Sequence, residues 1–490
     1  MKNQVQLITY VDRLSGGGFQ ALKALVERDL KGIVGGVHAL PFFDPIDGAD
    51  AGFDPSDHTT VDPRLGTWSD VLDLSASVEV MADMIVNHVS ANSPAFRNFL
   101  ENGDRSEYAD MFLTFDKVFP NGATQDDLLR LYRPRPGFSF TPIAFPDGKK
   151  KLIWTTFTPQ QIDIDVHSPH GSAYLERILD RFADAGITAI RLDAAGYAIK
   201  KAGTSCFMIP ETFTFLETLA HKARSRGMEV LVEIHSYYLD QIDIARKVDM
   251  VYDFALPPLV LHALFTGDST PLAEWLKISP RNAVTVLDTH DGIGVIDVGR
   301  HADGRAGLLT GPQIDNLVET MHARTNGESR KSTAAAANNL DLYQVNTTYY
   351  DALGQRDEDY LIARALQFFA PGVPQVYYVG LLGGTNDMAL LEKTHNGRDI
   401  NRHYYTASEV ETALAKPMVQ RLFDLIRLRN THPAFQGGFT VTQPSPQTLI
   451  LTWENGADRA ALSVNFKTVH AEIRYSQDGG EDLIVFGQTP

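Results

Sequence analysis

The 490-residue sequence has little that would tie it to an oxidising or membrane environment. It contains a single cysteine, Cys206, so no disulfide can form within the chain. A chain without disulfides suits a reducing compartment, and we predict a cytoplasmic location. No window approaches the roughly 20 apolar residues needed to span a bilayer, so we expect no membrane partner. Only Lys2 is basic before the first predicted strand, so we expect no signal peptide.

The sequence also lacks an excess of positive charge. It has 44 Lys and Arg residues against 61 Asp and Glu residues, a net charge of −17 at pH 7. That balance argues against a nucleic-acid partner, which would need a basic surface. An anionic substrate must then be bound by a local cluster of positive side chains rather than by the overall field.

Apolar strand-like runs alternate with amphipathic helical stretches for most of the length, which is typical of a parallel α/β sheet or barrel. Two of the helices are predicted at Gly171–Ala185 and Pro210–Arg226 from apolar residues at i, i+3, i+4 spacing. Eight runs are predicted as strands, the number in a closed (β/α)₈ TIM barrel. They are Val5–Tyr10, Gly35–Pro41, Val78–Val86, Ile187–Leu192, Glu229–Ile234, Met250–Leu256, Ala283–Leu287 and Val373–Val379.

Two long excursions and a tail interrupt this alternation. About eighty residues after the third strand are far more than an ordinary βα loop, and a second excursion, with a helix near Pro312–Thr325, follows the seventh strand. The tail has short alternating runs, such as Thr448–Trp453 and Ala460–Asn465, typical of a small antiparallel β domain. We therefore predict barrel segments 1–86, 167–291 and 354–436, an inserted domain at 87–166, a second insertion at 292–353 and a C-terminal β domain at 437–490.

Three acidic residues follow predicted strands at the ends where parallel barrels place their chemistry. Arg191 and Asp193 alternate along one strand and so point to the same side. The guanidinium favours the ionised carboxylate that a nucleophile needs, although a structural ion pair would look the same. Glu233 and Asp291 follow two further strands. A solvated loop end is the alternative for any one acid, but not for all three together.

These acids fit a retaining glycosyl-transfer reaction. Such a reaction needs two carboxyl groups ~5–5.5 Å apart, one ionised and one protonated. Arg191 favours the ionised form of Asp193. Glu233 lies between Val232 and Ile234, in a setting that we expect to be apolar and to favour its protonated form. Asp291 could then bind sugar hydroxyls more tightly as positive charge develops on the ring.

Four short segments, in this order and spacing, resemble the four signature regions of the α-amylase superfamily: Asp83–His88, Arg191–Asp193, Glu233 and His290–Asp291. The resemblance implies that Asp193 is the nucleophile, Glu233 the general acid/base and Asp291 the transition-state stabiliser. It also implies that His88, Arg191 and His290 line the subsite for the reacting sugar ring.

The sequence departs from starch-cleaving members of that superfamily after the fourth strand. Those members have a Lys-His pair that supplies a ligand to structural calcium, and this chain has Gly196 and Tyr197 instead. Asp44, Asp47 and Asp50 are three residues apart rather than at the alternate positions of a calcium loop. We predict no metal site.

More locally, the chain resembles the sucrose phosphorylase family along most of its length. The segments that carry this resemblance are Asp47–Asp54, Tyr132–Gly137, Leu340–Gln344 and Asn396–Arg402. By the resemblance, Asp50 and Arg398 pair at the blind end of a short pocket and hold the terminal hydroxyls of one glucose. Phe53 and Phe157 would be apolar platforms for the sugar, with ordinary core packing as the alternative.

Arg135 is the predicted phosphate-binding residue. Prolines on both sides fix its direction, and a guanidinium suits a tetrahedral oxyanion. From the residues alone a solvent-facing arginine is the alternative, and the family resemblance favours phosphate. The other predicted substrate-binding residues are Tyr197, Asp341, Tyr343, Gln344 and His235, the last of which could equally be a hydrogen-bonded loop histidine.

The resemblance implies reversible phosphorolysis of sucrose to glucose 1-phosphate and fructose, with inorganic phosphate as the second substrate and no cofactor. It leaves a homodimer open. Three alternatives remain: a sister phosphorylase for sucrose 6'-phosphate, glucosylglycerol or glucosylglycerate; a sucrose-type hydrolase; and a non-catalytic barrel serving a transporter. The last alternative predicts a membrane anchor and the loss of the three acids. The sequence shows no such anchor and has all three acids.

Overall fold

A closed barrel of eight parallel strands forms the centre of the molecule. The computed structural model describes residues 1–48, 50–134, 137–146, 148–301, 303–335, 344–477 and 480–487. The barrel strands are β1 (Gln6–Thr9), β2 (Gly36–Ala39), β5 (Glu79–Ile85), β10 (Ala189–Asp193), β11 (Glu229–Val232), β12 (Met250–Asp253), β13 (Ala283–Thr285) and β16 (Val373–Tyr377). Each matches one of the predicted strands, so the predicted TIM barrel is confirmed.

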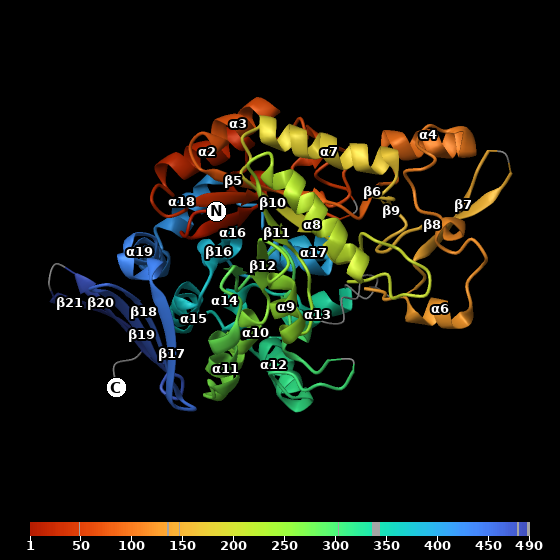
Figure 1. Cartoon of the computed structure of the whole chain (residues 1–490). Helices are drawn as coiled ribbons and strands as arrows, with labels where there is room; N and C mark the ends of the chain where they lie inside the picture. Colours follow the sequence, from red (N-terminus) through yellow and green to blue (C-terminus); the bar gives the residue numbers. More distant parts are fainter. Residues whose placement is uncertain are drawn as a thin grey trace.

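Helices surround the barrel (Figure 1). The predicted pair is confirmed as α7 (Pro169–Asp184) and α8 (Pro210–Arg224). Helix α7 starts where Ser168 accepts a hydrogen bond from the Gly171 amide, and it buries Leu175, Ile178 and Phe182 on one side. The others are α1 (Val11–Ser15), α2 (Phe19–Arg28), α3 (Trp68–Ser75), α9 (Tyr238–Ala245), α10 (Leu256–Thr266), α11 (Thr270–Ile278), α15 (Asp357–Phe369), α16 (Tyr378–Leu381), α17 (Met388–Thr394), α18 (Ala407–Leu414) and α19 (Pro417–Thr431).

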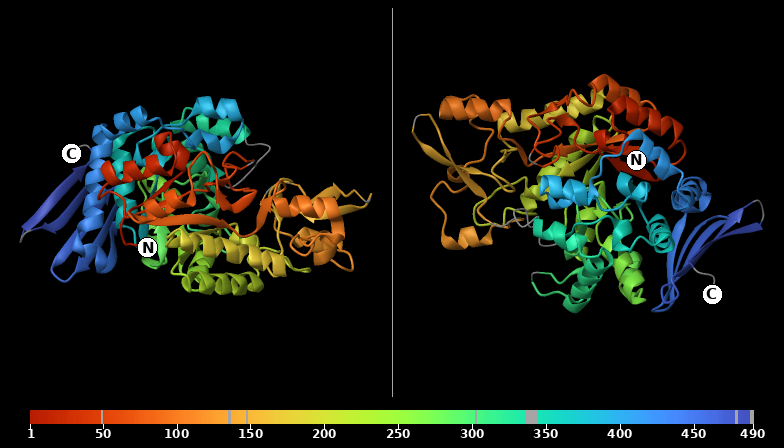
Figure 2. Two further views of the ribbon diagram at one scale, coloured as in Figure 1. Left: turned by 90° about the horizontal axis from the view of Figure 1, so that it is seen from above. Right: turned by 180° about the vertical axis from the view of Figure 1, so that it is seen from behind.

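The segment after β5 projects to one side of the barrel (Figures 1 and 2). Its elements are β6 (His88–Ser90), α4 (Pro94–Asn102), α5 (Phe115–Val118), α6 (Gln125–Arg130), β7 (Phe140–Ala144), β8 (Lys150–Trp154) and β9 (Gln161–Asp163). Strands β7 and β8 form one antiparallel pair, and β6 and β9 form another. A small apolar cluster around Phe119 and Trp154 stabilises this segment, and Cys206 from the loop after β10 packs into it. The exact ends of the inserted domain remain a prediction.

A second excursion follows β13. It contains β14 (Ile293–Gly294), α12 (Gly311–Arg324), α13 (Glu328–Ala335), β15 (Gln344–Val345) and α14 (Tyr349–Ala352), and α12 confirms the helix predicted there. Strands β14 and β15 pair antiparallel, with Gly294 opposite Gln344. This pairing returns the chain to the mouth of the barrel beside the end of β13. A further short antiparallel pair, β3 (Phe43–Asp44) and β4 (Asp57–Val61), follows β2.

The C-terminal part is a five-stranded antiparallel sheet beside α19 (Figure 2), which confirms the predicted β domain. Its strands are β17 (Gly438–Ser445), β18 (Thr448–Asn455), β19 (Asp458–Asn465), β20 (His470–Gln477) and β21 (Gly480–Phe486). Trp453 is buried and donates a hydrogen bond to the Phe369 carbonyl on α15 at 2.9 Å, so the sheet is fixed to the barrel helices. Within the described ranges, no helix is long and apolar enough to cross a membrane.

Candidate active site

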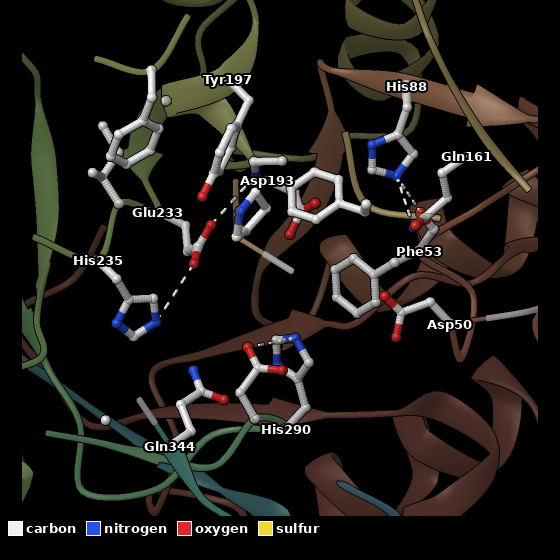
Figure 3. A pocket seen from close by; sticks show the side chains of 18 of the residues that line it. Asp50, Phe53, His88, Gln161, Asp193, Tyr197, Glu233, His235, His290 and Gln344 are labelled. Carbon is white, nitrogen blue, oxygen red and sulfur yellow. Dashed lines mark hydrogen bonds and ion pairs between the residues drawn. The ribbon is translucent and has the colours of Figure 1, made fainter. Parts of the chain in front are cut away.

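A pocket opens at the carboxyl ends of the barrel strands (Figure 3). Its empty volume is about 1050 Å³ including the open mouth, which is room for a disaccharide. Twelve of the predicted site residues line it: Asp50, Phe53, His88, Phe157, Asp193, Tyr197, Glu233, His235, His290, Asp291, Gln344 and Arg398. Arg191 lies directly beneath Asp193. Arg135, Asp341 and Tyr343 lie outside the described residues, so their roles stay predictions.

Arg191 is the centre of a buried charge network in the barrel. Its guanidinium contacts Asp193 Oδ1 at 2.9 Å and forms an ion pair with Asp83, its partner in register on β5. The His38 Nε2 lies 2.9 Å from the other oxygen of Asp83. Burial alone would raise the pKa of Asp83, but Arg191 and His38 outweigh it and lower that pKa to about 2. Arg191 is thus held from below by a fixed carboxylate while it contacts Asp193 above.

Asp193 and Glu233 act as a coupled pair of carboxyl groups. Burial raises the pKa of Asp193 to about 8; Arg191 opposes this rise and Glu233 adds to it. The two carboxyl groups interact, so their titrations are coupled and belong to the pair rather than to either residue alone. Arg191 lies 2.9 Å from Asp193 but 3.9 Å from Glu233, so its guanidinium stabilises a negative charge on Asp193 more strongly than one on Glu233.

The surroundings of Glu233 differ from the apolar setting expected from its sequence neighbours. The Ala194 amide donates to Glu233 Oε2 at 3.4 Å, and His235 Nε2 lies 3.6 Å from Oε1. Figure 3 shows Glu233 between Asp193 and His235. The expectation was wrong because Glu233 follows the last residue of β11, and its carboxyl lies beside polar groups of β10 and its loop and beside His235.

His235 carries a positive charge beside Glu233. Burial opposes that charge, but the Asp297 carboxylate, 3.2 Å from Nδ1, outweighs burial and raises the pKa of His235 to about 9. Asp297 is itself fully buried and accepts from the Ser236 amide at 3.0 Å. The Phe254 ring stacks on the imidazole at 3.8 Å. The predicted border residue of the acceptor side is therefore rigidly oriented.

Replacing Asp297 by asparagine should weaken the pH dependence of stability that His235 causes. Because the pKa of His235 is raised from 6.5 to about 9, its protonation stabilises the fold, fully so below pH ~6.5. This contribution to the free energy of unfolding is lost as the pH rises through 9. We expect the free energy of unfolding of the wild type to fall by on the order of 2 kcal/mol more than that of Asp297→Asn between pH 6 and pH 9.5. Urea unfolding at the two pH values measures this difference, and parallel curves would contradict it.

Asp291 also lines the pocket, next to two arginines. Burial alone would raise the pKa of Asp291, but Arg398 and Arg402 outweigh it and hold that pKa well below its usual range. Arg398 Nη1 is 2.8 Å from Asp291 Oδ1. The residue therefore stays ionised at any working pH. The predicted pairing of Arg398 with Asp50 stays a prediction, although both line the pocket.

Aromatic rings form the remaining walls. The Phe53 ring stacks on His290 at 4.8 Å, nearly parallel, and burial lowers the pKa of His290 to about 3, so this imidazole is neutral. The Phe157 ring packs edge-on to His88 at 5.5 Å and to Tyr197 at 5.1 Å. His88 Nε2 donates to the Phe53 carbonyl at 2.9 Å, which fixes the His88 ring. Neutral rings and fixed donors of this kind suit the faces and hydroxyls of one sugar unit.

The chain is similar to known proteins along nearly its whole length. Residues 30–251 match the family model described as alpha amylase, catalytic domain. A sucrose phosphorylase of Agrobacterium vitis is 68% identical over 97% of this chain and 98% of its own length. A sucrose phosphorylase of Bifidobacterium adolescentis is 55% identical over 94% of this chain and 92% of its own length. The chain belongs to the sucrose phosphorylase family. The crystal structure of a sucrose 6F-phosphate phosphorylase from Thermoanaerobacter thermosaccharolyticum is similar to this structure with a TM-score of 0.90 and 37% sequence identity. The match covers 99% of this chain and 98% of that one.

This sucrose phosphorylase family member holds Tyr197 in place with a buried lysine. The Lys200 ammonium contacts Asp163 Oδ2 at 2.9 Å, Asn87 Oδ1 at 2.8 Å and the Tyr197 carbonyl. It therefore joins β9 of the inserted segment to the loops after β5 and β10, at the edge of the pocket. Among the described residues, no group of three or more His, Cys, Asp or Glu side chains that could hold a metal ion is found.

Several residues that shape the pocket were not predicted from the sequence. Asp83 was named only as the start of a signature segment, and His38 could have been noticed because it is a polar residue inside a predicted apolar strand. Asp297 and Arg402 gave no such signal. Only in the folded chain does Asp297 contact His235 and Arg402 donate to the His290 carbonyl. Tyr132, Gln161 and Phe207 also line the pocket, from loops and from the short strand β9.

Proposed function

We propose that this protein catalyses the reversible phosphorolysis of sucrose to α-D-glucose 1-phosphate and D-fructose. The observation that carries the proposal is the placement of Asp193, Glu233 and Asp291 around one pocket, with Arg191 favouring the charge on Asp193. The 68% identity to a curated sucrose phosphorylase supports the choice of substrate. In the first step, the Asp193 carboxylate attacks the anomeric carbon of the glucosyl unit while Glu233 protonates the departing fructose oxygen.

In the second step, phosphate opens the β-glucosyl ester on Asp193. A phosphate oxygen bonds to the anomeric carbon, the ester bond to Asp193 breaks, and two inversions give net retention. Ionised phosphate hardly needs a general base, so Glu233 matters more in the first step. Asp291 stays ionised and stabilises positive charge on the ring in both steps. Arg135 is the proposed phosphate contact, and the mechanism requires no cofactor or metal.

Incubating the purified protein with sucrose, with and without inorganic phosphate, tests the proposal. Phosphate-dependent glucose 1-phosphate, formed in step with fructose, is the expected result. Free glucose formed regardless of phosphate would identify a hydrolase. A lack of sucrose turnover would favour a sister activity, since relatives include a glucosylglycerol phosphorylase at 42% identity and a glucosylglycerate phosphorylase at 32% identity.

We also propose a cytoplasmic homodimer. The single cysteine, buried and free, suits a reducing compartment. The inserted segment exposes Leu129, Phe138 and Leu152, with Phe138 83% exposed, and a second copy that covers these apolar side chains would remove them from water.

The double substitution Leu129→Ser with Phe138→Ser should convert the dimer to a monomer, because it removes the apolar side chains that the partner would cover. Light scattering coupled to size-exclusion chromatography measures the mass. Leu483→Ser, at a comparably exposed leucine of the C-terminal sheet, is the matched control and should stay dimeric. A wild-type mass near 54 kDa would contradict the proposal.

A further inference from the structure

The backbone just before Asp291 is held by two consecutive side chains of the segment between α17 and α18. The Asn401 Nδ2 donates to the Thr289 carbonyl at 3.1 Å, and the Arg402 Nε donates to the His290 carbonyl at 2.9 Å. These are the two carbonyls that directly precede Asp291. They fix the course of the chain at the point where it brings the Asp291 carboxylate to the pocket.

That segment is itself fixed to the barrel through three consecutive carbonyls. The hydroxyls of Tyr377 and Tyr378, at the end of β16 and the start of α16, donate to the carbonyls on either side of Arg402 at 3.0 and 2.6 Å. The carbonyl of Arg402 itself accepts from Arg13 Nη1, on α1, at 3.2 Å. All four side chains are buried. The segment therefore has little freedom to shift relative to the barrel strands.

The Arg402 guanidinium also lies between two carboxylates. Its Nη2 is 3.9 Å from Asp291 Oδ1, and its Nη1 is 3.7 Å from Asp399 Oδ1. Both distances exceed a hydrogen bond, so the guanidinium acts on these two groups through its charge. Arg398 differs, because it contacts Asp291 directly at 2.8 Å and lines the pocket, whereas Arg402 is fully buried behind it. Arg402 can therefore influence a bound sugar only through other residues.

We propose that Arg402 is a positioning residue for the transition-state stabiliser Asp291. The inference rests on the proposed function, because it requires Asp291 to stabilise positive charge on the glucosyl ring. Arg402 holds the His290 carbonyl and attracts the Asp291 carboxylate, so the negative charge is already in place when the positive charge develops. A displacement of such a group by about 1 Å can lower the rate by about 10²-fold.

Arg402→Met and Arg402→Lys test this role with two donors, sucrose and α-glucosyl fluoride, each with phosphate. Methionine keeps the apolar stem but loses the bond to the His290 carbonyl and the charge, so kcat should fall about ten- to a hundredfold. The fall should agree within about threefold for the two donors, because the charge on the ring does not depend on which group leaves. KM for sucrose should change by less than about threefold, since Asp291 binds the transition state more tightly than the substrate. Lysine keeps the charge but lacks the planar fork, so kcat should recover to about three- to tenfold below the wild type.

Arg429→Met is the matched control. Arg429 is also buried, and its Nε donates to the Phe368 carbonyl at 3.0 Å, but it lies at the amino ends of the strands, where it also donates to the Gly372 carbonyl just before β16. Its loss should lower the unfolding temperature about as much as Arg402→Met does. Its kcat with both donors should nevertheless stay within about twofold of the wild type.

A kcat within about twofold of the wild type in Arg402→Met would overturn the proposal. Slowing confined to sucrose, or a rise in KM at unchanged kcat, would overturn it as well. If Arg402→Met does not fold, the same criteria apply to Arg402→Lys. An equal fall of kcat in Arg429→Met would reduce Arg402 to a purely structural residue. Failure of the proposed function would show differently, because the wild type itself would form no glucose 1-phosphate from sucrose.

Discussion

Replacing Asp193 by asparagine is expected to lower kcat for sucrose phosphorolysis by about 10⁴-fold or more, since loss of a nucleophile removes the covalent route altogether. Asparagine keeps the shape of the side chain and can still contact Arg191, which lies 2.9 Å from Asp193 Oδ1. The fold and the glucose pocket should therefore survive. Steady-state kinetics measures kcat, and thermal unfolding checks the fold.

Azide provides the decisive control for this substitution. In Asp193→Ala, the space left by the carboxylate lets azide attack the anomeric carbon from the same side, and α-glucosyl fluoride as donor should give β-glucosyl azide. The wild type should not form that product at a comparable rate. More than about 1% of wild-type activity in Asp193→Asn, or an α-configured azide product, would show that Asp193 is not the nucleophile.

Replacing Glu233 by glutamine should slow release of fructose from sucrose by about 10²- to 10⁴-fold, the usual contribution of a general acid. Fructose leaves poorly without a proton, whereas fluoride leaves well. We therefore expect Glu233→Gln to turn over α-glucosyl fluoride with phosphate at a rate close to that of the wild type. Stopped assays of glucose 1-phosphate from the two donors measure the ratio.

Glu229→Gln, at the exposed opposite end of β11, is the matched control and should leave both donors unaffected. Equal slowing with sucrose and with the fluoride would mean that Glu233 acts on something other than the leaving group. His235, 3.6 Å from Glu233, would then be the next candidate for the acid.

The barrel and the positions of its acids could be predicted from the sequence, because both depend on local patterns. Eight apolar runs of strand length alternate with helices, and a barrel brings the carboxyl ends of its strands to one face. Asp193, Glu233 and Asp291 lie at or just beyond the carboxyl ends of three such runs, so their common pocket needs no knowledge of distant contacts.

The electrostatic surroundings of the site residues could not be predicted from the sequence, because they depend on long-range contacts. Glu233 has apolar neighbours in the chain, yet in the fold its carboxyl faces Arg191 and His235. His235 is charged because Asp297, 62 residues away, lies against it. Nothing in the sequence marks Lys200 as buried, yet its side chain lies buried among oxygens from three segments. Electrostatic surroundings depend on such pairs, and strand periodicity carries no information about them.

Exchange of isotope between phosphate and glucose 1-phosphate tests the double displacement most directly. The enzyme is incubated with α-glucose 1-phosphate and ³²P-labelled phosphate in the absence of fructose. A glucosyl ester on Asp193 forms and is reopened by phosphate, so label should enter glucose 1-phosphate, which keeps its α configuration. An absence of exchange in an enzyme that makes glucose 1-phosphate from sucrose would contradict the covalent mechanism.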